Sequence, residues 1–214
     1  LLLFIPIHPN SDFSFCFLLS CSMIKLDHIV VGALTLGQGV NYVRNILGSE
    51  PYGGGRHLGR GTHNKIMCLG DDLYLEVIAP DPDSDVKPQW FSLADDAVLE
   101  SLEKSPRLIA YVARTGDLET LLKETQYPLE AKPAQRDALR WSFGFSKDGN
   151  LLADGLLPYV MQWQSDHPAW TMKDSGCQLV RLQGFHPEPA HIQQTLQGLG
   201  FSDITVQYAE VPQL

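Results

Sequence analysis

The sequence lacks the features of a nucleic-acid-binding, membrane-bound or disulfide-stabilised protein. Its 16 Lys and Arg residues form no basic block, and 25 Asp and Glu residues outnumber them, which gives a formal net charge of −9. A surface that follows phosphates or anionic lipids is not expected, so neither nucleic acid nor membrane is predicted as a partner. The four cysteines lack CxxC spacing, so structural zinc and disulfides are not expected either.

The first 22 residues are apolar but lack the features of a targeting segment or a membrane span. No basic region precedes the apolar stretch, and Pro6, Pro9 and Asp12 interrupt any spanning helix. We interpret residues 1–22 as an upstream or non-native leader, with Met23 as the natural start. A cytoplasmic protein is therefore predicted.

The region after this leader has the pattern of a βαβββ module. Residues 25–34 form a β-branched run, and residues 35–48 carry apolar side chains at helical spacing that end at a glycine. Three short strand-like runs follow, at residues 50–57, 64–69 and 73–79. We assign module one to residues 23–104.

The same order of elements begins again in the second half. A strand at 108–114 leads into a helix from about Asp117, and later strands are predicted at 129–134, 138–145 and 157–164. This gives module two, residues 105–174. A third start predicts a β-α-β appendage over 175–214. The predicted fold class is α+β, in one domain with a shared core.

The glycine-rich segment YGGGRHLGRGTHNK, which begins at Tyr52, excludes two common sites. A P-loop ends in Gly-Lys-Ser/Thr ahead of a helix, whereas this segment lacks that ending and leads into strands. His57 and His63 are six residues apart among glycines, so they cannot form the paired histidines of a metalloprotease helix. No G-x-S-x-G elbow is present, and nucleophilic catalysis is not predicted.

Glu76 is a carboxylate within an otherwise apolar strand, between Tyr74, Leu75, Val77 and Ile78. An unpaired buried charge costs several kcal/mol, so a partner is required. A metal, an arginine, a hydrogen-bond donor or a raised pKa would each satisfy it. We therefore predict a catalytic role for Glu76.

Three segments carry a resemblance to a known family: LDHIVVGA, GTHNKIMCLGDDLYLEVIAPDP, and LRWSFGF with LLPYVMQWQSDHPAW. With the module repeat, they resemble the glyoxalase-like branch of the vicinal oxygen chelate superfamily, from Met23 onward. The resemblance implies that the paired modules form an open, curved mixed sheet whose concave face holds a divalent metal and a small-molecule substrate. By analogy with other paired modules, a homodimer is expected.

On this resemblance, His28 and Glu76 occupy the metal-ligand positions of module one. An imidazole and a carboxylate suit Zn, Fe, Mn or Ni and leave positions for vicinal substrate oxygens. Aligning the modules places Leu108 or Ile109 opposite His28 and Gln162 near the counterpart of Glu76, so the second pair of ligands is not repeated. Without a metal, Glu76 would act as general base, and His28 would be an ordinary strand histidine or a substrate contact.

Other residues are predicted to bind substrate. Thr62 and Asn64 fit the family's GT-x-N signature, although a turn-stabilising hydrogen bond would explain them equally well. Trp141 and Trp163 are predicted as pocket walls, with a purely structural core role as the alternative. The remaining predicted substrate-binding residues are His57, Arg140 and Gln162.

Two functions follow from these observations. The first is a small-molecule enzyme of isomerase, lyase or dioxygenase type that binds vicinal oxygens through a metal and stabilises an enolate-like intermediate. The second is a metal-free module that sequesters a hydrophobic small molecule. The His28 and Glu76 pair favours the enzyme, whereas the missing second-module ligands favour the binding module.

Overall fold

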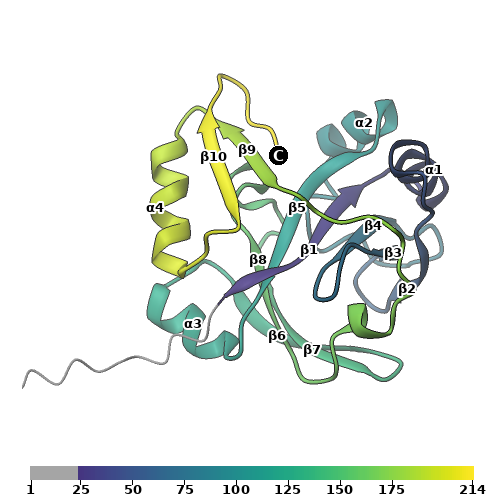
Figure 1. The fold of residues 1–214 in the computed structure, drawn as a ribbon, viewed down its shortest axis with the longest axis horizontal. Helices are drawn as coiled ribbons and strands as arrows, with labels where there is room; N and C mark the ends of the chain where they lie inside the picture. Colours follow the sequence, from purple (N-terminus) through teal and green to yellow (C-terminus); the bar gives the residue numbers. More distant parts are fainter. Residues whose placement is uncertain (1–23) are drawn as a thin grey trace, which may run out of the picture.

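The computed structural model describes residues 24–214 (Figure 1). The predicted leader, residues 1–22, and the predicted start at Met23 lie outside the described residues. Among the described residues, no helix combines the length and apolar character that crossing a bilayer requires.

Module one folds in the predicted order of strand, helix and three strands. Its elements are β1 (Lys25–Gly32), α1 (Leu36–Leu47), β2 (Tyr52–His57), β3 (Thr62–Cys68) and β4 (Tyr74–Pro80). The helix begins where Thr35 accepts a hydrogen bond from the Gln38 backbone and ends at Gly48, which is left-handed. A Cβ on Gly39 would lie 2.4 Å from Val77, so glycine allows α1 to pack closely on β4.

Module two repeats this order after a short linking helix, α2 (Asp96–Lys104), which the sequence analysis did not predict. Its elements are β5 (Arg107–Arg114), α3 (Leu118–Thr125), β6 (Glu130–Arg136), β7 (Leu139–Phe145) and β8 (Tyr159–Trp163). The strands that are central in the sheet are buried, because both faces of that part of the sheet are covered.

The two modules share one eight-stranded mixed sheet in the order β2-β3-β4-β1-β5-β8-β7-β6. They meet at the antiparallel pair of β1 and β5, which crosses the centre of Figure 1. The sheet curls into an open half-barrel with β2 and β6 at its edges. The prediction of an α+β fold built from paired modules in an open curved sheet is confirmed.

Matching bulges interrupt the central pair of strands. The register shifts between Leu26 and His28, which leaves Asp27 as the extra residue in β1, and it shifts again so that Ile109 is the extra residue in β5. Each bulge lies at the third position of an eight-residue strand, so Asp27 in module one and Ile109 in module two occupy equivalent positions. The module-two equivalent of His28 is therefore Ala110, one residue after the predicted equivalents Leu108 or Ile109.

The C-terminal appendage has a sheet of its own. Its elements are β9 (Leu182–His186), α4 (Pro189–Leu199) and β10 (Ile204–Tyr208), with β9 and β10 parallel. The unit lies beside module two, where α4 contacts α3 and Phe201 stacks on Tyr111. The predicted β-α-β unit is confirmed.

Candidate functional site

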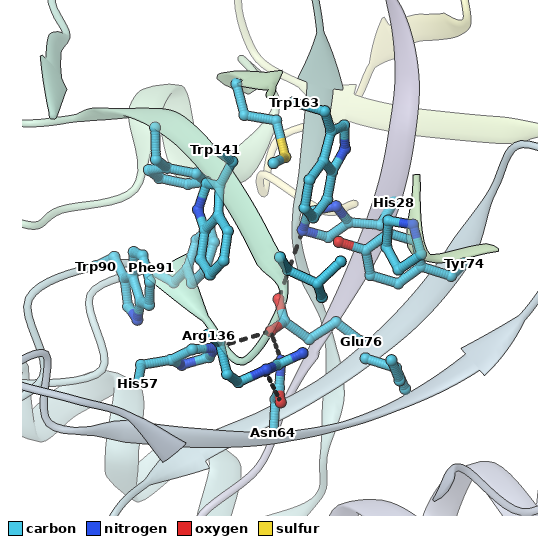
Figure 2. A pocket seen from close by; sticks show the side chains of 15 residues that line it. His28, His57, Asn64, Tyr74, Glu76, Trp90, Phe91, Arg136, Trp141 and Trp163 are labelled. Carbon is cyan, nitrogen blue, oxygen red and sulfur yellow. Dashed lines mark hydrogen bonds and ion pairs between the residues drawn. The ribbon is translucent and has the colours of Figure 1, made fainter. Parts of the chain in front are cut away.

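A cavity of about 50 Å³ lies inside the half-barrel, between the two modules (Figure 2). Module one lines it mainly with polar groups, namely His28, His57, Asn64, Tyr74 and Glu76. Module two lines it mainly with large apolar groups, namely Trp141, Phe143, Met161 and Trp163, together with Arg136. The cavity therefore has one reactive wall and one apolar wall.

His28 lies between two buried carboxylates. Its Nδ1 lies 2.7 Å from Oδ1 of Asp27, and its Nε2 lies 3.5 Å from Oε2 of Glu76. The bulge in β1 makes this possible, because adjacent residues of a regular strand point to opposite faces. The ring also stacks on Tyr74, with centroids 4.5 Å apart. Packing and hydrogen bonding together fix the orientation of the imidazole.

Asp27 is fully buried and receives donors from several elements. Trp163 Nε1 donates to its Oδ2 at 2.8 Å, and Arg114 Nη1 donates to the same oxygen at 3.5 Å. His167 Nε2 lies 3.1 Å from that oxygen, while its Nδ1 accepts from the backbone N–H of Ala169. Because a carboxylate can only accept, Nε2 of His167 donates to Asp27.

These contacts set the charge of the site at neutral pH. Burial disfavours the charged form of every group, but the hydrogen bonds from His167 and His28 hold the pKa of Asp27 well below its usual range. Against the same penalty, hydrogen bonds to Asp27 and Glu76 raise the pKa of His28 to about 9. Contact with His28 likewise lowers the pKa of Glu76 to about 2. The site thus holds an imidazolium between two carboxylates.

Asn64 is the second hydrogen-bonding partner of Glu76. Its Nδ2 donates to Oε1 of Glu76 at 2.5 Å, while its Oδ1 accepts from the backbone N–H of Gly55 at 2.9 Å. Gly54, with φ of 74°, lets β2 approach so closely that a Cβ there would lie 2.1 Å from the backbone carbonyl oxygen of Asn64. The glycine-rich segment therefore serves to orient Asn64.

His57 lies at the edge of the cavity and is neutral. Burial lowers its pKa to about 4, because the nearby Glu76 carboxylate offsets only part of the desolvation penalty. Its Nδ1 lies 2.8 Å from Oγ1 of Thr62, which also accepts from Nε1 of Trp90, and its Nε2 lies 3.8 Å from Oε1 of Glu76. In the tautomer with hydrogen on Nε2, His57 presents a donor near Glu76.

The structure brings six of the nine predicted site residues together. The cavity-lining residues are His28, His57, Asn64, Glu76, Trp141 and Trp163. Thr62 is buried behind His57 rather than in the cavity. Arg140 is exposed and donates to the Ala138 carbonyl. Gln162 accepts from the backbone N–H of Leu118 and donates to the Gly116 carbonyl, at the beginning of α3.

Several residues of the site were not predicted, among them the ionisable residues Asp27, Tyr74, His167 and Arg136 and the apolar lining residue Met161. Asp27 precedes His28 directly, and regular alternation would direct it to the other face of the sheet. The sequence gives one signal, since Asp27 is a carboxylate within a buried strand, as Glu76 is. Arg136 ends β6, and only the curvature of the sheet brings it to Asn64, 2.9 Å away.

The donors facing the cavity do not form a complete metal site. Within residues 24–214, no three His, Cys, Asp or Glu side chains are placed to surround one ion. The module-two equivalent of His28 is Ala110. Glu76 pairs with Val30 across neighbouring strands and Tyr159 pairs with Val112 in the same way, so Tyr159 is the equivalent of Glu76. Module two therefore supplies no counterpart ligand.

Comparison with known proteins identifies the family. The model of the family described as glyoxalase-like domain matches residues 26–200. The chain therefore belongs to the glyoxalase-like domain family, and the predicted membership of the vicinal oxygen chelate superfamily is confirmed. A comparison with curated proteins found no match.

One of the solved structures that are similar to this chain shares its fold. A hypothetical protein from Staphylococcus aureus has a TM-score of 0.64 at 14% identity, with 89% of this chain and 88% of that chain covered. Methylmalonyl-CoA epimerase from Mycobacterium tuberculosis has a TM-score of 0.42 at 17% identity, with 64% of this chain and 85% of that chain covered. At 14% identity, the similarity to the protein from Staphylococcus aureus bears on the fold alone.

Proposed function

We propose that this protein is a small-molecule enzyme that transfers protons on a substrate bound in the cavity, with His28 and Glu76 as the reacting pair. The observation that carries the proposal is the pair itself. Two buried, oppositely charged groups 3.5 Å apart face one cavity, with Asp27 directly behind the imidazole. Burial of this charge costs free energy, and a catalytic role explains why the charge is retained.

Each residue has a distinct role in this proposal. The Glu76 carboxylate accepts a proton from a carbon next to a substrate carbonyl, as a general base. The protonated Nε2 of His28 donates to the oxygen on which enolate charge develops. Asp27 is a positioning residue, since it holds the ring and its charge without facing the cavity. The reaction class supported is isomerisation or elimination, because both begin with such a proton transfer.

The test is hydrogen exchange in D₂O, followed by NMR. The panel is phenylpyruvate, levulinate and 4-hydroxy-2-butanone, which each carry an acidic C–H beside a carbonyl. We expect the wild type to accelerate exchange for at least one compound and Glu76→Gln to lose about 10²- to 10⁴-fold of that acceleration. Glu50→Gln is the matched control, because Glu50 is exposed and pairs with Arg44. Equal exchange rates in wild type and Glu76→Gln would contradict the proposal.

A divalent ion held by His28 and Glu76 is the second candidate function, which the family resemblance implies. The two donor atoms face the same cavity, and the ion would polarise substrate oxygens there. Elemental analysis of untagged protein measures this. Stoichiometric metal that is lost in Glu76→Gln would support the candidate. Substoichiometric metal, with thermal stability unchanged by a chelator, would contradict it.

A metal-free sequestration module remains the alternative to any enzyme. The observation in its favour is the apolar wall, where Trp141 and Trp163 lie with centroids 5.6 Å apart. Such a module would bind an apolar compound equally well in wild type and Glu76→Gln, and neither protein would catalyse exchange. We also propose a homodimer, by analogy with other paired modules, and light scattering on the eluting protein measures the mass that decides it.

A further inference from the structure

Arg136 is the one cationic side chain that module two contributes to the cavity lining. It ends β6, an edge strand of the sheet, yet it extends across the mouth to module one. Its Nη1 donates to Oδ1 of Asn64 at 2.9 Å, and a Cβ on Gly55 of the opposite edge strand would lie 3.2 Å from its Cδ (Figure 2). Arg136 therefore bridges the two edges of the half-barrel next to Asn64, the hydrogen-bonding partner of Glu76.

Among the arginines of the described residues, Arg136 is the one that lines the cavity, and it has no carboxylate partner there. Arg44, Arg56 and Arg114 each pair with a carboxylate, at distances of 2.5–3.1 Å. Over residues 24–214, no carboxylate pairs with half-buried Arg136, whose hydrogen bond to Asn64 uses one of five donors. Removing such a group from water without a counter-charge is unfavourable. An anionic ligand would supply that charge.

Arg136 is also the one side chain with a permanent positive charge among the described residues that line the cavity, because a guanidinium stays protonated at any pH at which proteins are folded. This cation occurs in a protein whose net charge is −9.

We propose that the substrate is a small carboxylic acid with an apolar body, whose carboxylate binds Arg136. The guanidinium fork matches a planar carboxylate in a two-point interaction. The apolar body would lie against Trp141, Met161 and Trp163, and the reacting carbon of the substrate would face Glu76. A single guanidinium matches the one negative charge of a carboxylate better than the charge of about −1.5 to −2 of a phosphate group. This inference rests on the cavity used by the proposed function and specifies its substrate class.

The test measures binding of acid and amide pairs of the same shape. Benzoate, phenylacetate and 3-phenylpropionate are compared with their amides by quenching of tryptophan fluorescence, since Trp90, Trp141 and Trp163 line the cavity. For at least one pair we expect the acid to bind about tenfold more tightly than the amide. Arg136→Gln should abolish this preference, and Arg136→Lys should keep part of it.

Arg140→Gln is the decisive comparison, because Arg140 lies in the same β6–β7 hairpin but is exposed. We expect it to retain the full preference for acids. The inference is overturned if no acid is preferred, if Arg136→Gln keeps the preference, or if Arg140→Gln loses it instead. Tighter binding of phenylphosphonate than of phenylacetate would overturn the carboxylate assignment in favour of phosphate. If Arg136→Gln does not fold, Arg136→Lys and Arg136→Met decide by the same criterion.

Failure of this inference and failure of the proposed function give different results. Glu76→Gln should lose hydrogen exchange but keep the preference for acids, because Arg136 is intact. An acid preference that depends on Arg136, in a wild type that catalyses no exchange, would support the substrate class and contradict the enzyme. Exchange that depends on Glu76, without any acid preference, would support the enzyme and overturn the substrate class.

Discussion

The two modules of this protein have the same topology but contribute different chemistry. In module one, β1, β3 and β4 supply an imidazole, an amide and a carboxylate to the cavity, at His28, Asn64 and Glu76. In module two, β7 and β8 supply mostly aromatic rings and a thioether, and the one charged group comes from the edge strand β6. Both modules curve around one cavity, so the reactive groups need to be present only once.

The matched bulges show how far the two modules differ at equivalent positions. Asp27 in β1 matches Ile109 in β5, and both side chains are fully buried. In module one, this position holds a carboxylate with four donors around it, whereas in module two it holds a core aliphatic side chain. The bulge is therefore a feature of both modules. Only module one has a carboxylate at the bulge, and this carboxylate holds His28 in the site. The following predictions test this difference, beginning with the largest expected effect.

Asp27→Asn should cause the largest loss of stability. Its charge offsets the burial of His28, and removing one partner of a buried ion pair typically costs about 3–5 kcal/mol. The side-chain NH₂ of the new asparagine would also point its hydrogens at groups that themselves donate hydrogen bonds to Asp27. Urea unfolding measures the loss. The control is Asp72→Asn, whose side chain is 48% exposed and pairs with Lys25 and Arg114, and for which about 1 kcal/mol or less is expected. Equal losses in both variants would contradict the central role of Asp27.

The free energy of unfolding should be highest near pH 6.5 and should fall on both sides. The folded-state pKa of His28 is raised to about 9, so its contribution is fully present below pH 6.5 and is lost as the pH rises through 9. The loss is on the order of 3 kcal/mol for a shift of this size. As the pH falls below 6.5, His57 takes up a proton in the unfolded protein but stays neutral in the folded protein until its pKa of about 4. The unfolded state then binds more protons, so the free energy of unfolding falls.

Urea unfolding at half-unit pH steps measures this profile. In His28→Gln, the decline between pH 6.5 and 9 should disappear, while the decline below pH 6.5 should remain because His57 is intact. A wild-type profile that is flat above pH 6.5, or the same decline in His28→Gln, would show that His28 is not held as an imidazolium.

Trp163→Phe should destabilise the protein by about 1 kcal/mol. The variant loses the hydrogen bond from Nε1 to Asp27, while Asp27 keeps its other donors. This variant tests whether Trp163 of module two stabilises Asp27 of module one in addition to lining the cavity. Trp141→Phe is the matched variant, because the Trp141 ring also lines the cavity but forms no hydrogen bond with Asp27. The same loss in both variants would indicate that only ring size matters.

The hydrophobic pattern of the sequence predicted the fold well, for a physical reason. Strands and helices bury apolar residues at periods of 2 and 3.6, and both modules keep these periods. Glu76 was found because a carboxylate in an apolar strand interrupts the pattern. Asp27 was missed because a bulge reverses the face that alternation predicts for it. Arg136 was missed because its place in the site depends on the curvature of the whole sheet, which no local pattern contains.

Gln162→Ala should have the smallest effect and separates the sequence-based assignment from the structural one. In β8, Gln162 alternates with the cavity-lining residues Met161 and Trp163, and its amide binds backbone groups at Leu118 and Gly116. We expect a loss of stability of about 0.5 kcal/mol in urea unfolding, at the low end of the range for a hydrogen bond. Hydrogen exchange and the preference for acids should not change. A fall in ligand affinity without loss of stability would instead place Gln162 at the substrate, and module two would then contribute a polar group from β8 as well as Arg136.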